Sequence, residues 1–174
     1  SVSQETFDLY LDESLDMLVT HPQPSLDVLG KYYESVDYIS HTDSKRSLFE
    51  KAYHFVKNIA LKNKLELINS FEPSKGSILD IGAGTGDFLA VAASDGWKTV
   101  GVEPSDKAKA IAKCKGVSFV ERTSQLENHS FDVITMWHVL EHVPNLDEQI
   151  QELKGLLKPS GTLIVAVPNF KSFD

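Results

Sequence analysis

The sequence predicts an α/β fold in which a doubly wound, mostly parallel sheet carries helices on both faces. From residue 77 onward, short apolar runs alternate with helical patterns, which is typical of successive βαβ units. A glycine-rich turn joins the first of these runs to the first helix, and polar or acidic residues follow the ends of the runs. Because ligands of open parallel sheets bind outside the carboxyl ends of the strands, these observations predict a binding site at that edge.

The core of the predicted fold occupies residues 71–174. The last apolar run has no polar side chain after its first residue, as expected of a strand that is covered on both faces. The expected strands cover residues 77–81, 99–103, 117–120, 131–136 and 162–167. The expected helices cover residues 86–95, 104–113 and 145–157, and the last of them ends at the Lys158-Pro159-Ser160-Gly161 segment.

The preceding part of the chain, residues 1–70, is expected to form a hairpin and a helical lid segment. Apolar residues alternate on both sides of Asp12-Glu13-Ser14, which predicts a β-hairpin that ends at Pro22-Gln23-Pro24. A short helix is expected over residues 26–38, and the longest helical pattern of the chain covers residues 44–70.

The long helix is rich in basic residues, which allows two interpretations. They form either a stripe that binds an anionic partner or a solvated face whose long side chains cover apolar surface. We favour the solvated face, because the positive charges do not fall on one narrow stripe. The residues are Lys45, Arg46, Lys51, Lys57, Lys62 and Lys64.

The overall composition limits the classes of function. The 174 residues include 17 Lys and Arg and 25 Asp and Glu, so the formal net charge is −8. Such an acidic chain is poorly suited to bind nucleic acid or membrane surfaces. A single cysteine, Cys114, excludes an internal disulfide framework, and no apolar run approaches the ~20 residues of a membrane span. With no visible signal peptide, the composition predicts a cytoplasmic protein.

The glycine turn has an unusual spacing. Gly82, Gly84 and Gly86 form a G-x-G-x-G pattern, whereas the dinucleotide-binding fingerprint G-x-G-x-x-G requires glycine at position 87, which is Asp87 here. Asp80 and Asp87 bracket the turn. Acids at both ends suit a cationic ligand better than a pyrophosphate.

Asp80-x-Gly82-x-Gly84-x-Gly86 resembles motif I of the class I S-adenosylmethionine-dependent methyltransferases. The segments 131–134, 137–144 and 156–163 are similar to the fourth-strand region and the following helix end of small-molecule members of this family, and the resemblance covers residues 76–168. It implies a Rossmann-like fold, S-adenosylmethionine as the cofactor and methyl transfer to a small-molecule acceptor. An NAD(P)-dependent oxidoreductase and a noncatalytic S-adenosylmethionine-binding module are the alternatives.

The cofactor is expected to lie along the carboxyl ends of the strands. Glu103 follows Gly82 by 21 residues, which is close to the spacing expected of an acid that accepts hydrogen bonds from ribose hydroxyls. Both methyltransferases and dehydrogenases use such an acid. The resemblance places Thr123 and Ser124 beside the adenine, and Tyr38 and His41 in a lid. The expected cofactor-binding residues are Asp80, Gly82, Ala83, Gly84, Gly86, Glu103, Pro104, Thr123, Ser124, Trp137, Tyr38 and His41.

His138 and His142 are the candidate catalytic residues. A hydroxyl acceptor needs a general base, and these histidines lie in the loop that is expected to face the site. His138-Val139-Leu140-Glu141-His142 also matches the H-x-x-E-H pattern of some zinc proteases, but Pro144 breaks the chain before a long helix forms. We therefore expect no metal site. A divalent ion that is held by Glu141 or His142 and assists methyl transfer is a separate alternative.

The resemblance extends to the N-terminal hairpin, which in some bacterial relatives carries a C-x-x-C half of a zinc ribbon. Asp12 and Leu15 occupy the matching positions, so no structural zinc is expected. Members of the family continue beyond the fifth strand with a helix and an antiparallel strand pair. Because the sequence ends at Asp174, we expect a fold truncated after that strand, whose exposed edge could drive homodimer formation.

Overall fold

The computed structural model describes residues 5–25 and 48–172, with side chains in the long helix described from Ala52 onward. The chain divides into two compact units. One comprises residues 44–167, and the other comprises residues 1–43 together with residues 168–174. The division that we predict at residue 70 stays a prediction.

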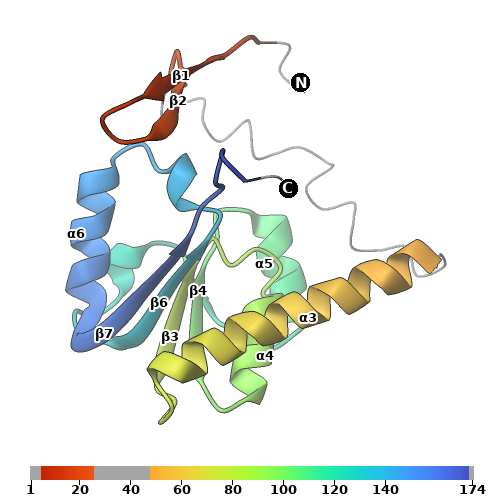
Figure 1. The fold of residues 1–174 in the computed structure, drawn as a ribbon. Coiled ribbons are helices and arrows are strands. Elements are labelled where there is room, and N and C mark those ends of the chain that lie inside the picture. Colours follow the sequence, from red (N-terminus) through yellow and green to blue (C-terminus); the bar gives the residue numbers. More distant parts are fainter. Residues whose placement is uncertain (1–4, 26–47, 173–174) are drawn as a thin grey trace. The chain divides into compact units, whose positions relative to one another are not determined.

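The larger unit contains a parallel sheet of five strands in the order β5-β4-β3-β6-β7 (Figure 1). This arrangement confirms the predicted α/β fold with a mostly parallel sheet. The strands are β3 (Ser77–Ile81), β4 (Lys98–Val102), β5 (Phe119–Val120), β6 (Phe131–Trp137) and β7 (Leu157–Ala166). The helices are α3 (Leu48–Phe71), α4 (Asp87–Ser94), α5 (Asp106–Lys113) and α6 (Leu146–Leu156).

Two hydrophobic clusters pack on the sheet, and the alternation of side chains along β3 separates them. Ile78 packs in one cluster with Ile68 of α3 and Phe88 of α4, whereas Leu79 packs in the other with Leu153 of α6. Since successive residues of a strand point to opposite faces, helices cover the sheet on both sides, as predicted for a doubly wound fold.

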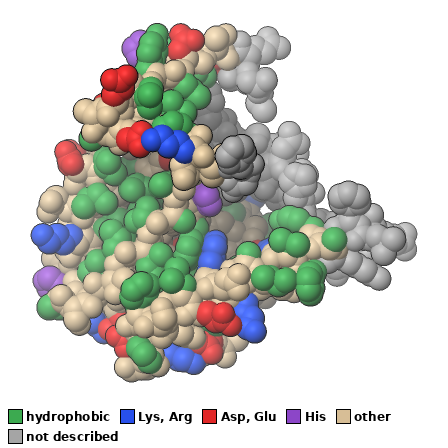
Figure 2. All heavy atoms as spheres, viewed as in Figure 1, with side chains coloured by type: hydrophobic (Ala, Val, Ile, Leu, Met, Phe, Trp, Pro, Cys, Tyr) green, Lys and Arg blue, Asp and Glu red, His purple; other side chains and the backbone are tan. Residues whose placement is uncertain are grey.

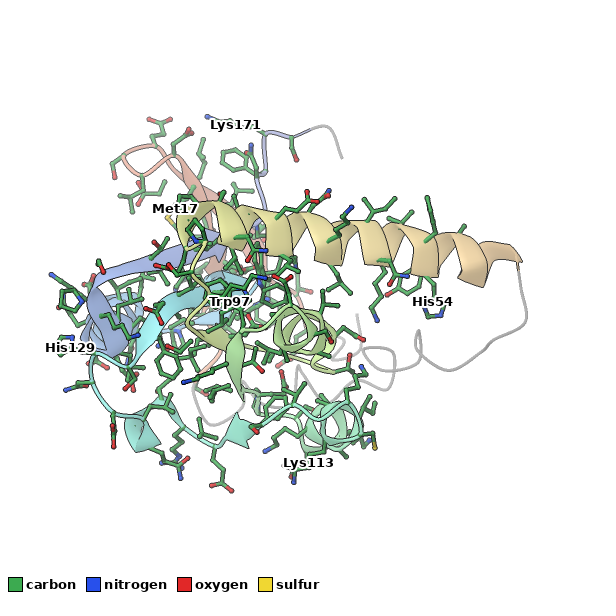
Figure 3. All side chains as sticks on the ribbon, turned by 90° about the horizontal axis from the view of Figure 1, so that it is seen from below. Met17, His54, Trp97, Lys113, His129 and Lys171 are labelled. Atoms are coloured by element: carbon green, nitrogen blue, oxygen red, sulfur yellow. The ribbon has the colours of Figure 1, made fainter. Side chains whose placement is uncertain are left out.

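Helix α3 is fixed to the sheet by a buried tryptophan. Trp97, labelled in Figure 3, is 4% exposed, and its Nε1 donates a hydrogen bond to Asn69 Oδ1 over 2.9 Å. Asn69 in turn donates from Nδ2 to Asp95 Oδ2 over 2.9 Å, and Lys75 forms a 2.9 Å ion pair with the same carboxylate. These contacts hold the C-terminal half of α3 in place against α4.

Two strands begin two or more residues away from their predicted starts. Strand β5 begins at Phe119 rather than at Val117, because the Val117 N–H donates to Ala112 O at the end of α5 and cannot join the sheet. Strand β7 begins at Leu157, since that residue pairs with Phe131 before a register shift that brings Thr162 opposite Val133. Two short 3₁₀ turns, η2 (Thr123–Gln125) and η3 (Leu140–His142), were not predicted.

Asp132 connects three strands at the end of the sheet where β3 begins. Its Oδ2 accepts hydrogen bonds from Ser77 N over 2.8 Å and from Ser77 Oγ over 2.9 Å, and Lys158 Nζ lies 2.8 Å away. Burial raises the pKa of Asp132, but the hydrogen bonds from Lys158 and Ser77 outweigh burial and hold the pKa below its usual value. Asp132 thus joins the start of β3 to β6 and β7.

We expect Asp132→Ala to lower the free energy of unfolding by about 2 kcal/mol at pH 7, because a partly buried amide loses a charged acceptor. The ionised carboxylate stabilises the fold above its unfolded pKa near 4, and this contribution is lost as the pH falls through the lower folded pKa. Urea titrations at pH 7 and pH 3 should therefore show a smaller difference at pH 3. Glu127→Ala, at an exposed acid, is the control. An equal loss at both pH values would contradict this role.

In the smaller unit, β1 (Asp8–Asp12) and β2 (Met17–His21) form the predicted antiparallel hairpin. The Asp12 carboxylate accepts hydrogen bonds from Ser14 N over 2.9 Å and from Leu15 N over 3.2 Å, so it caps the turn of the hairpin. Its pKa is lowered by the bonds from Ser14 and Leu15. The expected absence of zinc stays a prediction.

Candidate functional site

A pocket of about 270 Å³ opens beside the carboxyl ends of β3 and β6, under the inner face of α3. Figure 2 shows the molecule hollowed beside α3, with basic side chains visible in the hollow. The lining residues come from α3, β3, the glycine turn, α4 and the end of β6: Tyr53, Lys57, Ala60, Leu61, Lys64, Asp80, Gly82, Ala83, Thr85, Asp87, Phe88 and Trp137. The pocket therefore lies at the predicted edge of the sheet.

All three glycines of the turn have left-handed backbone angles, with φ of 69° at Gly82, 53° at Gly84 and 70° at Gly86. A Cβ at Gly82 would lie 2.4 Å from Val139 Cγ2, and one at Gly86 would lie 2.8 Å from Ala112 Cβ. A Cβ at Gly84 would meet nothing within 4 Å. Two glycines are thus required by the packing of the protein itself, while Gly84 leaves open space for a ligand.

Glu103 lies directly after β4, against the glycine turn. The residue is 5% exposed, its Oε2 accepts a hydrogen bond from Gly84 N over 2.8 Å, and its Oε1 accepts one from Ser105 N over 2.9 Å. Each carboxylate oxygen has remaining lone pairs with which it can accept further hydrogen bonds. The structure therefore brings the predicted ribose acid next to the turn that is predicted to hold the cofactor.

Asp80 is the buried acid of the pocket. It is 3% exposed, it is paired in register with Thr135 of β6, and Thr135 Oγ1 donates to Asp80 Oδ1 over 2.6 Å. Burial raises the pKa of Asp80 to about 7, against the opposing effects of the Thr135 hydrogen bond and of the Lys64 charge. Such a carboxylate is a strong partner for a cation that replaces its lost hydration.

Two lysines of α3 line the pocket, and our interpretation of the basic residues as a solvated face is wrong for them. Lys57 Nζ lies 2.7 Å from Asp87 Oδ2, and Lys64 Nζ lies 4.3 Å from the ring centroid of Trp137. The signal in the sequence is their spacing, since residues seven apart lie on the same side of an α-helix. The other described basic residue of α3, Lys62, is 75% exposed.

Asp87, at the start of α4, is held by three donors. Lys57 Nζ, Lys115 Nζ and Thr85 Oγ1 lie 2.7, 2.8 and 2.7 Å from its carboxylate oxygens. Burial raises the pKa of Asp87, but these hydrogen bonds outweigh it and lower the pKa to about 2. Lys115 Nζ also donates to Thr85 O over 2.7 Å, so the cluster fixes the glycine turn from both sides.

The two candidate catalytic histidines lie in the loop after β6. Both are exposed; His138 Nδ1 lies 3.7 Å and His142 Nε2 lies 4.0 Å from Glu141 Oε1. His138 has a left-handed φ of 58°, and its N–H donates to Ala166 O of β7 over 2.8 Å. The H-x-x-E-H pattern ends in a 3₁₀ turn, and no group of three potential metal ligands exists within residues 5–25 and 48–172.

The remaining predicted residues are less close to the pocket. Thr123 donates from Oγ1 to Glu152 Oε1 over 2.5 Å, and Ser124 and Pro104 are exposed; none of the three lines the pocket. Tyr38 and His41 lie outside the described residues. Asp80, Gly82, Ala83 and Trp137 line the pocket, whereas Gly84, Gly86 and Glu103 are not among its lining residues. Glu103 is hydrogen-bonded to Gly84 N in the adjoining turn.

A doubly wound sheet with an acid-bracketed glycine turn and an acid after the second strand of its core defines a protein that binds an adenosine-containing cofactor. A model of the family described as "Methyltransferase domain" matches residues 48–173. The chain belongs to this family, and specifically to the class I S-adenosylmethionine-dependent methyltransferases. The NAD(P)-dependent alternative is not favoured.

Curated relatives are similar over part of their length. The chain is 33% identical over 131 residues to a ubiquinone biosynthesis O-methyltransferase of Actinobacillus pleuropneumoniae, covering 65% of this chain and 56% of the relative. It is 30% identical over 149 residues to the protein of that name from Rickettsia canadensis, covering 80% and 63%. The chain therefore spans less than two thirds of the length of these relatives.

Solved structures show the same fold. A protein of Thermotoga maritima described as an S-adenosylmethionine-dependent methyltransferase, possible histamine N-methyltransferase, has a TM-score of 0.56 at 28% identity, covering 71% of this chain and 58% of that one. The PH0226 protein of Pyrococcus horikoshii has a TM-score of 0.60 at 22% identity, covering 81% and 63%. The second likeness concerns the fold alone. No helix among the described residues is long and apolar enough to cross a membrane.

The pocket and the glycine turn beside it fit S-adenosylmethionine. Gly84 has room for a ligand where a side chain would lie, and Glu103 has free acceptor sites beside it. Asp80 provides a carboxylate and Lys64 provides an ammonium. These opposite charges match the ammonium and the carboxylate at the amino-acid end of this cofactor. Glu103, the glycine turn and Asp80 would hold it.

Proposed function

We propose that the protein transfers a methyl group from S-adenosylmethionine to a small-molecule acceptor. The observation that carries the proposal is Glu103, which is hydrogen-bonded to Gly84 N within a glycine turn beside a pocket lined by apolar, acidic and basic side chains. When bound, the cofactor supplies an electrophilic methyl group on a sulfonium, so the protein has chiefly to orient the two reactants. The predicted cytoplasmic location and homodimer stay predictions.

The chain supplies residues for orientation and for proton transfer. Glu103 and the glycine turn would bind the adenosine part, and the buried Asp80 would bind a positive group. His138 and His142, in the loop after β6, are the proposed bases for an acceptor with a hydroxyl group, because an imidazole nitrogen can accept the proton of such a group. Relatives carry names of both O- and N-methyltransferases, so a small molecule with either atom fits the proposal.

Thermal unfolding with S-adenosylhomocysteine, S-adenosylmethionine and NAD tests the cofactor. At a hundredfold excess over the dissociation constant, either adenosyl ligand should raise the free energy of unfolding by about 2.7 kcal/mol, whereas NAD should have no effect. Formation of S-adenosylhomocysteine with a panel of catechols and amines then tests the reaction. Stabilisation by NAD alone would contradict the proposal, and binding of S-adenosylmethionine without turnover would favour a noncatalytic module.

The raised pKa of Asp80 predicts that cofactor affinity depends on pH. Below pH 7 this carboxyl is protonated, so binding a ligand ammonium against it requires the release of a proton. We expect the dissociation constant of S-adenosylhomocysteine to be about tenfold higher at pH 6 than at pH 8, measured by calorimetry. 5′-Methylthioadenosine, which has no amino-acid end, is the control. The same pH profile for both ligands would contradict a role for Asp80 in binding the ammonium.

A further inference from the structure

We propose that Val139 is a positioning residue that couples cofactor binding at the glycine turn to the placement of His138 and His142. The inference rests on the proposed function, in which these two histidines are bases for the acceptor. It adds to that function the side chain through which the cofactor site contacts the loop that carries the bases, residues 138–143.

The contact lies at Gly82, in the wall of the pocket. Gly82 is a lining residue of the pocket, whereas Val139 is not. A Cβ built on Gly82 would lie 2.4, 3.4 and 3.5 Å from the Cγ2, Cγ1 and Cβ atoms of Val139, and these are the three atoms nearest to it. Val139 therefore packs on Gly82 from a side that the pocket does not occupy.

The turn on which Val139 packs is short and held by hydrogen bonds. Gly82 N and Ala83 N donate to Val102 O over 2.8 and 3.1 Å, and Gly84 N donates to Glu103 Oε2 over 2.8 Å. A ligand that binds Glu103 and enters the space beside Gly84 acts directly on this segment. Because protein interiors are closely packed and transmit strain, a small displacement of the turn reaches the side chain that packs on it.

The loop has an apolar inner side and a polar outer side. Val139, Leu140 and Val143 pack against one hydrophobic cluster of the sheet, whereas the side chains of His138 and His142 are 64% and 52% exposed. His138 directly precedes Val139, and His142 N donates to Val139 O over 2.9 Å. A shift of Val139 therefore moves the backbone that carries both imidazoles.

The backbone of His138 makes this arrangement stiff. Its φ is 58°, in the left-handed region, and its N–H donates to Ala166 O of β7 over 2.8 Å. A residue with a side chain adopts this conformation at a cost, and it persists only where its surroundings hold it. Here β7 holds the N–H of His138, and the next side chain along, that of Val139, is held against Gly82.

NMR spectroscopy of the histidine side chains tests the inference, because it needs no acceptor. Saturating S-adenosylhomocysteine should shift the imidazole signals of His138 and His142, which His138→Gln and His142→Gln assign. The signal of His129, which precedes β6 at the opposite end of the sheet, should not shift (Figure 3). Val139→Ala leaves the contact with Gly82 unfilled. It should reduce both shifts by more than half, while the dissociation constant of the ligand changes by less than about threefold.

Val143→Ala is the matched control, since it makes the same truncation in the same loop and cluster and leaves Val139 on Gly82. It should keep both shifts, and so should Val139→Ile, which retains the two γ carbons. Undiminished shifts in Val139→Ala would show that the ligand acts on the imidazoles directly and would overturn the inference. An equal loss in Val143→Ala, or no shift in wild-type protein that binds the ligand, would overturn it as well.

Gly82→Ala is a second and independent variant, because it presses on Val139 from the turn. In the free protein it should already shift the signals of His138 and His142. Gly84→Ala, whose Cβ would meet nothing within 4 Å, should leave them in place. Unchanged histidine signals in Gly82→Ala would contradict the coupling. If wild-type protein binds no adenosyl ligand at all, the proposed function fails and the inference fails with it.

Discussion

Replacing Glu103 by alanine is expected to weaken the binding of S-adenosylhomocysteine by at least a hundredfold. Glu103 is 5% exposed, and its carboxylate is already oriented by Gly84 N and Ser105 N, so it can accept hydrogen bonds from two ribose hydroxyls without further ordering. Each hydrogen bond to a charged group contributes about 1.5–3 kcal/mol, and two such bonds correspond to a factor of about 10² to 10⁴ in affinity. Isothermal titration calorimetry measures the loss directly.

The same substitution also removes the acceptor of two backbone N–H groups. We therefore expect Glu103→Ala to lower the free energy of unfolding by about 1–3 kcal/mol, which urea titration of the free protein separates from the effect on binding. Glu127→Ala, at an exposed acid, is the control for both measurements. If Glu103→Ala binds S-adenosylhomocysteine as tightly as the wild type, Glu103 is not the ribose acid.

Gly82→Ala is expected to lower the free energy of unfolding by about 2–5 kcal/mol. The new Cβ would lie 2.4 Å from Val139 Cγ2, and the residue keeps a φ of 69° that an L-residue adopts at a cost. Val139 is β-branched and cannot move away by a simple rotation, so the overlap adds a cost of about 1–3 kcal/mol. Chemical denaturation of the free protein provides the measurement.

Gly84→Ala is the natural comparison, because its Cβ would meet nothing within 4 Å. It should cost only about 1–2 kcal/mol of stability through its left-handed backbone, yet weaken cofactor binding, since the new methyl group enters the space left for the ligand. The two variants thus separate packing from binding. Equal stabilities of Gly82→Ala and Gly84→Ala would show that Val139 does not constrain the turn.

The sheet could be predicted from the sequence because its signals are local. The run from Ser77 to Ile81, the glycines after it and the acid Glu103 each follow from periodicity and spacing along the chain, and the structure assembles them at one edge. The shortened β5 could not be predicted, because it depends on whether the Val117 N–H joins a neighbouring strand or caps α5. Such a competition is decided only by tertiary structure.

The contribution of α3 to the pocket was missed for a different reason. The six basic residues of the predicted helix obscured the fact that Lys57 and Lys64 share a face, and no local signal shows which face of a helix lies against a distant strand. The roles of Gly82 and Gly84 also look identical in sequence. They differ because Val139, more than fifty residues later, packs against one and not against the other.

The most direct test of the account is an experimental structure of the protein with S-adenosylhomocysteine. We expect the ribose hydroxyls within hydrogen-bond distance of the Glu103 carboxylate, the chain of the ligand passing Gly84, and its amino-acid end between α3 and the end of β6 beside Asp80 and Lys64. A ligand that lies elsewhere, or in the reverse orientation with its adenine at Trp137, would contradict the account.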